Sequence, residues 1–447
     1  MSLCFTATAA GPVYVVLWFD TEDYMEPSAD DAALRIARDL TSLGVRGVFK
    51  VVGEKARVLE QRNRQDVIRA LAQHDIGYHT DFHSVPPTPS LYLRESGWTD
   101  GAEEFFRLES KGASDVKRIF GKQLNCYGQP GSSWGPQTNP ALRRMGIHVY
   151  LDEGSQVGVE SQPFWYGGLL HIFNMGKFLI RPSLEKGDSL QDTLKQFDGL
   201  AAELTARGGG VISTYYHPTE FVTTEFWDGV NFSHGAGPER KDWKLPRRRT
   251  PEDSERCYRI LTAYVQHALK NPNVKFVTAK ELLELYGSPI PHYPDRAVIQ
   301  KHMAERQTFA IANGETLSAA DMLLNLLGLT HMEIDGPARR AETTLKTASI
   351  PRERFARMSR EAVGFIQAYK RLPDLVWAES EKLSIGDFAA TLAADDGKSP
   401  DVAVRKANLE FERYFSTDGK GSFGWVIHPQ GFDGSALLDL GRLQGWT

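Results

Sequence analysis

The stretch Val13-Tyr-Val-Val-Leu-Trp-Phe-Asp-Thr-Glu-Asp-Tyr24 joins an apolar run directly to a cluster of carboxylates. A short apolar run rich in β-branched and aromatic residues predicts a buried β-strand. Residues 30–43 then carry apolar side chains at helical spacing, and Gly44 follows as a typical helix stop. The beginning of the chain therefore predicts a strand, a polar loop and a helix in succession.

This alternation continues to about Tyr286. Besides residues 13–19, we expect strands at 47–52, 76–78, 124–127, 148–151, 178–180, 211–216 and 275–277. Apolar residues at helical spacing also occur at 65–72, 114–120 and 189–206. Alternating strands and helices imply parallel pairing, with the helices outside the sheet. Some eight strands in about 270 residues predict an α/β fold of the distorted or incomplete (β/α) barrel type.

The composition excludes several classes of protein. The chain has 447 residues, 41% of them hydrophobic and 24% charged, which is typical of globular proteins. Its net charge of −5 offers no basic excess for binding nucleic acid. The longest apolar runs are far shorter than the roughly 20 residues of a membrane span. We therefore expect a soluble protein with no transmembrane segment and no nucleic-acid partner.

The cysteines and the N-terminus say less about the compartment. Cys4, Cys126 and Cys257 are too few and too scattered for a disulfide framework or a cysteine zinc cluster. The N-terminus lacks the basic region and long apolar core of a signal peptide. Ala-Thr-Ala-Ala at 7–10 nevertheless resembles the small-residue end of one. The sequence leaves export and the cytoplasm open, and favours export to the periplasm or cell envelope.

A second region begins after residue 287. Gly-Ser-Pro-Ile-Pro-His-Tyr-Pro at 287–294 is a proline-rich joint, and the alternation ends there. We expect a catalytic domain at 1–287 and a smaller, mainly α-helical domain of helix–strand repeats at 288–447. The pattern A-x-x-E-x-L-S-x-x-D occurs at 312–321 and again at 378–387, with a fainter third copy from Phe432-Asp433. Each Ser-x-x-Asp predicts a capped helix, and such repeats usually pack or bind rather than catalyse.

Carboxylates and histidines follow two of the predicted strands. Asp20, Glu22 and Asp23 come after the first strand, where three carboxylates repel one another unless a cation compensates. His79 and His83 follow the strand at 76–78, and neutral imidazole suits Zn²⁺. The alternative is an acidic helix-capping loop beside two structural histidines. Because strand ends converge in α/β barrels, the two groups together favour a catalytic metal site of two histidines and one carboxylate.

Two further segments could take part in catalysis. His217 closes the strand at 211–216, where it could serve as a general acid, although a lone histidine is more often structural. Asn-Cys-Tyr-Gly-Gln-Pro-Gly-Ser-Ser-Trp at 125–134 is a loop rich in glycine that could present backbone N–H groups to an oxyanion. Its alternative is a simple turn.

These four segments, in this order, resemble the polysaccharide deacetylase family, carbohydrate esterase family 4, also called the chitooligosaccharide deacetylase homology domain. The resemblance covers about residues 13–286. Phe19-Asp20 resembles the start of the family motif Thr-Phe-Asp-Asp-Gly, which implies that Asp20 is the general base. Thr21 displaces the second acid, so the implied metal ligand is Asp23, with Glu22 as the alternative.

Three other segments of the chain match motifs of the family. His79, Thr80 and His83 fit the family's His-Ser/Thr-x-x-His metal motif in full, and His217 matches the histidine that protonates the leaving amine. Gly47-Val-Phe-Lys-Val-Val-Gly53 resembles the family's second strand, Ala-Thr-Phe-Phe-Val-Val-Gly.

The third and fourth motifs depart from the family. Gly128 stands where the family has an arginine that orients the base, so Asp20 is held otherwise or its basicity differs. Gln129, Pro130 and Gly131 follow. Asp152 is a candidate for the carboxylate of the fourth motif, although its tryptophan partner is missing.

The resemblance implies a metal-dependent hydrolase, with zinc as the expected metal, that removes acetyl groups from an N-acetylated sugar or polysaccharide. Backbone amides near Gly131 would hold the oxyanion. Aromatic side chains near the strand ends could stack on sugar rings or simply pack; these are Trp134, Trp165, Tyr166 and Trp227.

Two alternatives remain open at this point. One is hydrolysis of a small non-sugar amide, and the other is a non-catalytic carbohydrate-binding protein of the envelope. The C-terminal repeats faintly resemble pseudomurein-binding repeats, which would imply docking to a cell-wall polymer.

Overall fold

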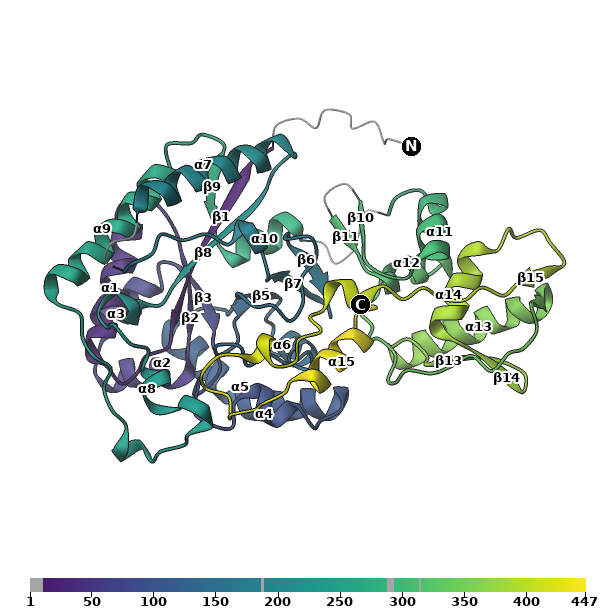
Figure 1. Cartoon of the computed structure of the whole chain (residues 1–447), viewed down its shortest axis with the longest axis horizontal. Helices are drawn as coiled ribbons and strands as arrows, with labels where there is room; N and C mark the ends of the chain where they lie inside the picture. The colour runs from purple at the N-terminus through teal and green to yellow at the C-terminus, as the bar shows by residue number, and fades with distance from the viewer. Residues whose placement is uncertain (1–10, 186–188, 288–292, 313–314) are drawn as a thin grey trace.

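A computed structural model of the chain describes residues 11–185, 189–287, 293–312 and 315–447. Figure 1 shows a larger N-terminal part built around a sheet and a smaller C-terminal part of short helices and hairpins. The signal-like segment at 7–10 and most of the proline-rich joint lie outside the described residues. None of the described helices is long and apolar enough to cross a membrane.

The N-terminal part is organised by one large sheet. Its strand order is β6-β7-β5-β4-β3-β2-β1-β8, and β9 also pairs with β1. All pairs are parallel except the β6–β7 hairpin. The strands are β1 (Val13–Thr21), β2 (Val48–Val51), β3 (Asp75–Tyr78), β4 (Cys126–Tyr127), β5 (Val149–Leu151), β6 (Phe164–Tyr166), β7 (Leu169–Ile172), β8 (Gly210–Tyr216) and β9 (Val274–Val277).

The predicted fold class is confirmed by this pairing. Parallel strands alternate with helices, and within the described residues no pairing joins β6 to β8, so the barrel is incomplete. β1 is buried along nearly its whole length because it has strands on both edges and helices outside, which explains its unbroken apolar run.

Helices cover the outside of this sheet (Figure 1). In α1 the side chains of Ala33, Ile36, Ala37 and Leu40 form the buried face that the spacing predicted. The helices are α1 (Pro27–Ser42), α2 (Gly53–Gln61), α3 (Gln65–Leu71), α4 (Pro89–Leu93), α5 (Trp98–Phe120), α6 (Thr138–Arg144), α7 (Leu190–Ala206), α8 (Trp227–Asn231), α9 (Pro251–Ala268) and α10 (Ala279–Tyr286).

Two strand predictions need correction. The strand expected at 178–180 is wrong: a 3₁₀ turn covers Gly176–Phe178, and Leu179 makes only a single bridge to Ser213. Gly176 has a φ of +53°, which interrupts an extended chain. The β6–β7 hairpin was not expected, although its Gly167-Gly168 turn, with φ of +57° and +75°, is a typical hairpin signal.

The C-terminal part contains the repeated unit. In each copy a β-hairpin precedes a helix whose N-terminus is capped by serine: Ser318 accepts from the N–H of Asp321, and Ser384 from that of Asp387. The elements are α11 (Arg296–Glu305), β10 (Ala310–Ala312), β11 (Glu315–Leu317), α12 (Ala319–Leu326), β12 (Ser349–Pro351), α13 (Arg352–Tyr369), β13 (Leu375–Ala378), β14 (Glu381–Ser384), α14 (Ile385–Ala394), β15 (Asp401–Ala403) and α15 (Ser435–Leu443). The third copy leads into α15, but the described residues before that helix form no hairpin.

After β15 the chain returns to the N-terminal part. We call residues 415–434 the return segment; it is yellow in Figure 1. Phe415 bridges to Val157, and the N–H of Ser416 donates to the carbonyl of Gln156 at 3.0 Å. After the return segment, α15 contacts β6, where the hydroxyl of Tyr166 donates to the carbonyl of Gly441. The division at residue 287 stays a prediction, and the end of the chain packs against the part before it.

Candidate metal and catalytic site

A cavity of about 560 Å³ lies where the parallel strands end. Because β1, β3, β5 and β8 all run in the same direction, the loops after them meet at this edge of the sheet. The cavity is lined by these residues from the sequence predictions: Asp20, Glu22, His79, His83, Gly131, Asp152 and His217.

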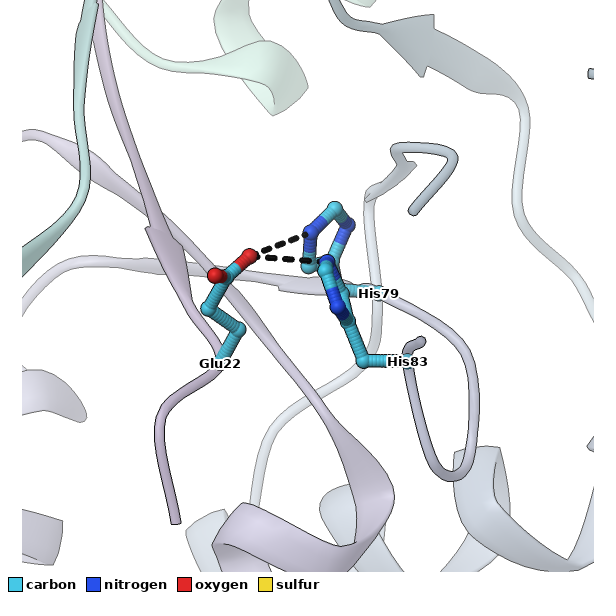
Figure 2. A group of neighbouring side chains, drawn as sticks. All are labelled: Glu22, His79 and His83. Carbon is cyan, nitrogen blue, oxygen red and sulfur yellow. Dashed lines mark ion pairs between the residues drawn. The ribbon is translucent and has the colours of Figure 1, made fainter. Parts of the chain in front are cut away.

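Glu22, His79 and His83 point toward one another (Figure 2). Glu22 Oε2 lies 2.7 Å from His83 Nε2 and 3.5 Å from His79 Nε2. All three side chains are buried. Despite these short separations, neither Nε2 atom makes a hydrogen bond. One carboxylate oxygen and two imidazole nitrogens thus converge within 4.8 Å.

Neighbouring groups hold the two imidazoles in place. The Nδ1 of His79 lies 3.0 Å from the carbonyl oxygen of Gly128, which can only accept, so Nδ1 carries the proton. The Nδ1 of His83 lies 2.6 Å from Ser84 Oγ, which donates to Asp228 at 3.1 Å. Both partners direct an Nε2 lone pair into the cluster. These three residues therefore fit a divalent cation, since an imidazole that ligates a metal typically donates its other N–H to such a partner.

Glu22 is held as a charged ligand. Burial opposes its ionisation, but the adjacent His83 and His79 hold the pKa of Glu22 well below its ordinary value. Its other oxygen accepts a hydrogen bond from Trp227 Nε1 at 3.1 Å. Trp227, which the sequence suggested for sugar stacking or packing, is fully buried and instead orients the carboxylate.

Of the two carboxylates considered as metal ligands, Glu22 joins the histidines and Asp23 does not. Asp23 Oδ1 accepts from the N–H groups of Met25 and Glu26, both at 2.9 Å, and Oδ2 accepts from Thr219 at 2.9 Å. Asp23 thus closes the turn into α1. The physical reason is the alternation of an extended chain, which places Asp20 and Glu22 on one side and Asp23 on the other.

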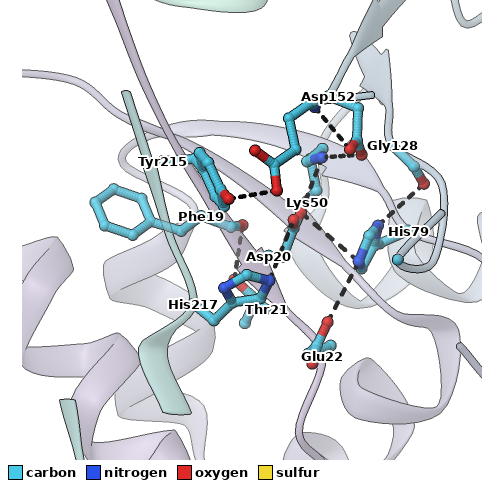
Figure 3. Close-up of polar contacts among 12 residues, drawn as sticks. Phe19, Asp20, Thr21, Glu22, Lys50, His79, Gly128, Asp152, Tyr215 and His217 are labelled. Atoms are coloured by element: carbon cyan, nitrogen blue, oxygen red, sulfur yellow. Dashed lines mark hydrogen bonds and ion pairs between the residues drawn. The ribbon is translucent and has the colours of Figure 1, made fainter. Parts of the chain in front are cut away.

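Asp20 belongs to a second buried set that contains its own cation (Figure 3). Lys50 Nζ lies 2.9 Å from Asp20 Oδ1 and 2.7 Å from Asp152 Oδ2, and donates to the carbonyl of Leu151 at 2.8 Å. It also lies 4.0 Å from the centre of the Trp18 ring. Asp20, His79 and Asp152 are close enough to hold a metal as well, but the ammonium already occupies the space between the two carboxylates.

The two carboxylates of this set differ in acidity. Burial alone would raise the pKa of Asp20, but His79 and Lys50 bring it below its ordinary value. Burial raises the pKa of Asp152 to about 8, against the opposing effect of Lys50. Asp20 is therefore the one of the two that is charged at neutral pH, which is the state that a general base needs.

Gly128 explains how Lys50 reaches this position. A Cβ atom on residue 128 would lie 2.0 Å from Lys50 Nζ and 2.4 Å from Asp152 Oδ2. Any larger side chain here, including the arginine of the family motif, would displace the ammonium. Asp20 is thus held by Lys50 from β2, a residue that the sequence motif contained but to which it gave no role.

His217 faces Asp20 from β8. Its Nε2 lies 3.6 Å from Asp20 Oδ2, and its Nδ1 lies 2.7 Å from Glu220 Oε1. Arg181 Nη1 donates to the same oxygen of Glu220 at 2.9 Å. Burial would lower the pKa of His217, but Glu220 and the nearby carboxylates raise it to about 9. The imidazole is therefore protonated at neutral pH, as a general acid must be.

None of the four aromatic side chains that were considered for sugar stacking is among the residues that line the cavity. Trp134 is buried in the core, and Trp165 and Tyr166 line a separate small pocket near α12. The aromatic side chains that do line the cavity are Tyr215, Phe226 and, from the return segment, Trp425. No local sequence signal connects residue 425 with the strand ends.

No family model matches the chain, and no curated protein matches it. Its fold is similar to solved structures of low identity. Puue allantoinase is 13% identical over 63% of this chain and 92% of its own, with a TM-score of 0.40. A candidate polysaccharide deacetylase from Mycobacterium smegmatis is 14% identical over 63% and 94%, with a TM-score of 0.39. A family 4 acetyl xylan esterase from Clostridium thermocellum, solved with cobalt, is 14% identical over 62% and 93%, with a TM-score of 0.33. At these identities the likeness concerns the fold alone.

Proposed function

We propose that this protein is a metal-dependent amide hydrolase that removes the acetyl group from an N-acetylated sugar. One observation carries the proposal: two imidazoles, each held with its Nε2 lone pair facing Glu22, lie beside a charged carboxylate, Asp20. A set of two histidines and one carboxylate leaves coordination positions open, as catalytic metal sites require.

The metal in this proposal is zinc, held by Glu22, His79 and His83. When bound, such a cation supplies Lewis acidity to the amide carbonyl and lowers the pKa of water. The donor set of imidazole and carboxylate suits Zn²⁺ among divalent ions.

The protein's own side chains would perform the proton transfers. Asp20 takes a proton from the attacking water as its oxygen bonds to the carbonyl carbon. Lys50 and Asp152 hold Asp20 in place for this step. The C–N bond then breaks, and His217 gives its proton to the departing nitrogen. Water and amide thus become acetate and a free amine, with backbone N–H groups near Gly131 proposed as donors to the oxyanion.

Two variants test this proposal. Asp20→Asn should lose acetate release from N-acetylglucosamine and its oligomers while keeping the bound metal, because the amide has no charge to accept a proton. His79→Ala should lose the metal itself, measured by elemental analysis. Turnover of Asp20→Asn at the wild-type rate, or a wild-type protein that takes up no divalent ion, contradicts the proposal.

We also propose that the protein is exported and that its hairpin–helix units dock on an envelope polymer. Trp377 on the second hairpin supports the docking, because this residue is 53% exposed and aromatic faces are suited to sugar rings. Lys382 Nζ lies 5.2 Å from the centre of this ring. Trp377→Ala should weaken co-sedimentation with insoluble cell-wall polymer without changing hydrolysis of small substrates; unchanged sedimentation contradicts the docking.

A further inference from the structure

The return segment supplies one side of the catalytic cavity. Gly421, Ser422, Gly424 and Trp425 line it together with the loops after the strands. These residues lie more than 200 positions along the chain from His217, the last of the proposed catalytic residues. The cavity is therefore shaped by a part of the chain that holds none of the proposed metal or catalytic residues.

The segment is fixed on both sides of the cavity. The N–H of Trp425 donates to Ser132 Oγ at 3.0 Å, in the loop after β4, and its indole Nε1 donates to Asp228 at 2.9 Å, in α8. Gln156 donates to the carbonyl of Ser422 at 2.5 Å. The segment thus connects two parts of the rim, the loop after β4 and helix α8.

Further along, the segment is buried. His428 lies 2.8 Å from Ser90 Oγ, and Ile427 is fully buried beside Trp227. The loop after β4 is also shaped to admit the indole. A Cβ atom on Gly131, whose φ is +52°, would lie 2.3 Å from Trp425 Cδ1. These contacts show that the return segment is packed in place as one wall of the cavity.

The wall presents aromatic rings toward the proposed acid. The rings of Trp425 and Phe226 meet edge to face at 5.8 Å, and those of Phe226 and His217 meet edge to face at 4.8 Å. Trp425 is only half-buried, so its ring borders the cavity. Glu153 also lines the cavity, and its carboxylate can accept hydrogen bonds from hydroxyl groups.

This arrangement suits a single ring rather than a continuous strand of polymer. A sugar has an apolar C–H face that stacks on an indole and a rim of hydroxyls that needs acceptors. The cavity of about 560 Å³ falls within the roughly 300–1,000 Å³ of small-molecule sites. A polymer bound by an interior unit would have to leave the cavity on two sides, and the return segment crosses one of them.

We propose that the return segment restricts the substrate to a single N-acylated sugar or the terminal unit of a chain, with its ring stacked on Trp425. This inference rests on the proposed function for its chemistry. Trp425 acts here as a specificity-determining residue that contacts the substrate.

The experiment uses the full-length, metal-loaded protein. Penta-N-acetylchitopentaose, treated with wild type and sequenced by mass spectrometry, should lose acetyl from one end only. Trp425→Ala should raise KM for N-acetylglucosamine or its disaccharide about 10-fold, the effect of losing a stacked ring. Its kcat and metal content should stay close to wild type, and Trp425→Phe should recover most of the loss. Tyr369→Ala, at an exposed aromatic residue that ends α13, is the matched control and should change none of these values.

Binding separates this inference from the proposed function. Calorimetry on metal-loaded Asp20→Asn should detect N-acetylglucosamine or its disaccharide, and adding Trp425→Ala should weaken that binding by the same factor. Sugar binding that depends on Trp425, without any hydrolysis by wild type, would overturn the proposed function and leave this inference standing. Removal of interior acetyl groups, or an unchanged KM in both Trp425 variants, would overturn this inference alone.

Discussion

Two sets of buried polar side chains lie next to each other in the cavity, and the negative charge of their carboxylates is balanced in different ways. In the set of Asp20, Lys50 and Asp152 the chain supplies the cation, with Nζ at 2.9 and 2.7 Å from the two carboxylates. In the set of Glu22, His79 and His83, one carboxylate oxygen and two imidazole nitrogens face one another. Among the described residues, no lysine or arginine side chain is paired with this group, and the two Nε2 atoms make no hydrogen bond. Buried anions need a partner: the first set has one in Lys50, whereas the second, in which Glu22 faces two imidazoles, has the donor atoms that suit a cation from outside.

The largest expected effect comes from breaking the second set. His79→Ala removes one of its two nitrogen donors, so the metal content measured by elemental analysis should fall from about one ion per chain to none. His267→Ala is a suitable control, because that histidine pairs with Asp198 on the surface, away from the cavity. Retention of the metal by His79→Ala would contradict the assignment of His79 as a metal ligand.

Breaking the first set should act on stability and activity, with the metal retained. Lys50→Met removes the ammonium but keeps the length of the side chain, and leaves Asp20 and Asp152 buried beside each other. Losing one partner of a buried ion pair costs about 3–5 kcal/mol, so the free energy of unfolding in urea should fall by that amount. Exposed Lys241→Met is the control. A loss of metal in Lys50→Met would show that the two sets are not independent.

A smaller effect should follow from removing the hydrogen bond that orients one proposed metal ligand, His83. Ser84→Ala removes the oxygen beside His83 Nδ1, at 2.6 Å, and leaves the ligand in place. Losing such an outer contact typically weakens metal affinity about 10- to 100-fold. Competition with a chelator of known affinity would measure the change, and an unchanged affinity would contradict the role given to Ser84.

The smallest expected effect is a shift in pH dependence. Asp20 lies near two basic side chains, Lys50 and His217. Of these, His217 is the one whose charge changes with pH in the range of an activity assay. Activity needs protonated His217, so it should fall as the pH rises through the pKa of His217, near 9. Glu220→Gln removes the largest influence that raises this pKa, and the alkaline limb of kcat should therefore move toward neutral pH. Identical profiles for the two proteins would contradict the assignment of His217 as the acid.

The positions of most site residues could be predicted because they follow strands. Residues at the ends of parallel strands converge whatever the details of packing. Asp20, His79, His83 and His217 follow such strands, so the sequence alone predicted that they lie close together. The choice between Glu22 and Asp23 was also accessible, since alternation in an extended chain puts Glu22 on the side of Asp20.

Other features depend on contacts that no local pattern records. Lys50 is a lone charge in a short strand, and its partner Asp152 lies about a hundred residues away. The Gly167-Gly168 turn carried a hairpin signal, but the apolar runs beside it were too short to mark strands. Trp425 reaches the cavity only through the tertiary packing of the return segment.

The return segment also sets an order of events during synthesis. The residues proposed to bind the metal and to catalyse all lie before residue 218, whereas one side of the cavity comes from residues 421–425. On the ribosome, the sheet and its side chains can therefore assemble while the wall has still to be translated. A nascent chain at that stage would lack this side of the cavity, and the restriction proposed for Trp425 would arise only when the last segments fold back.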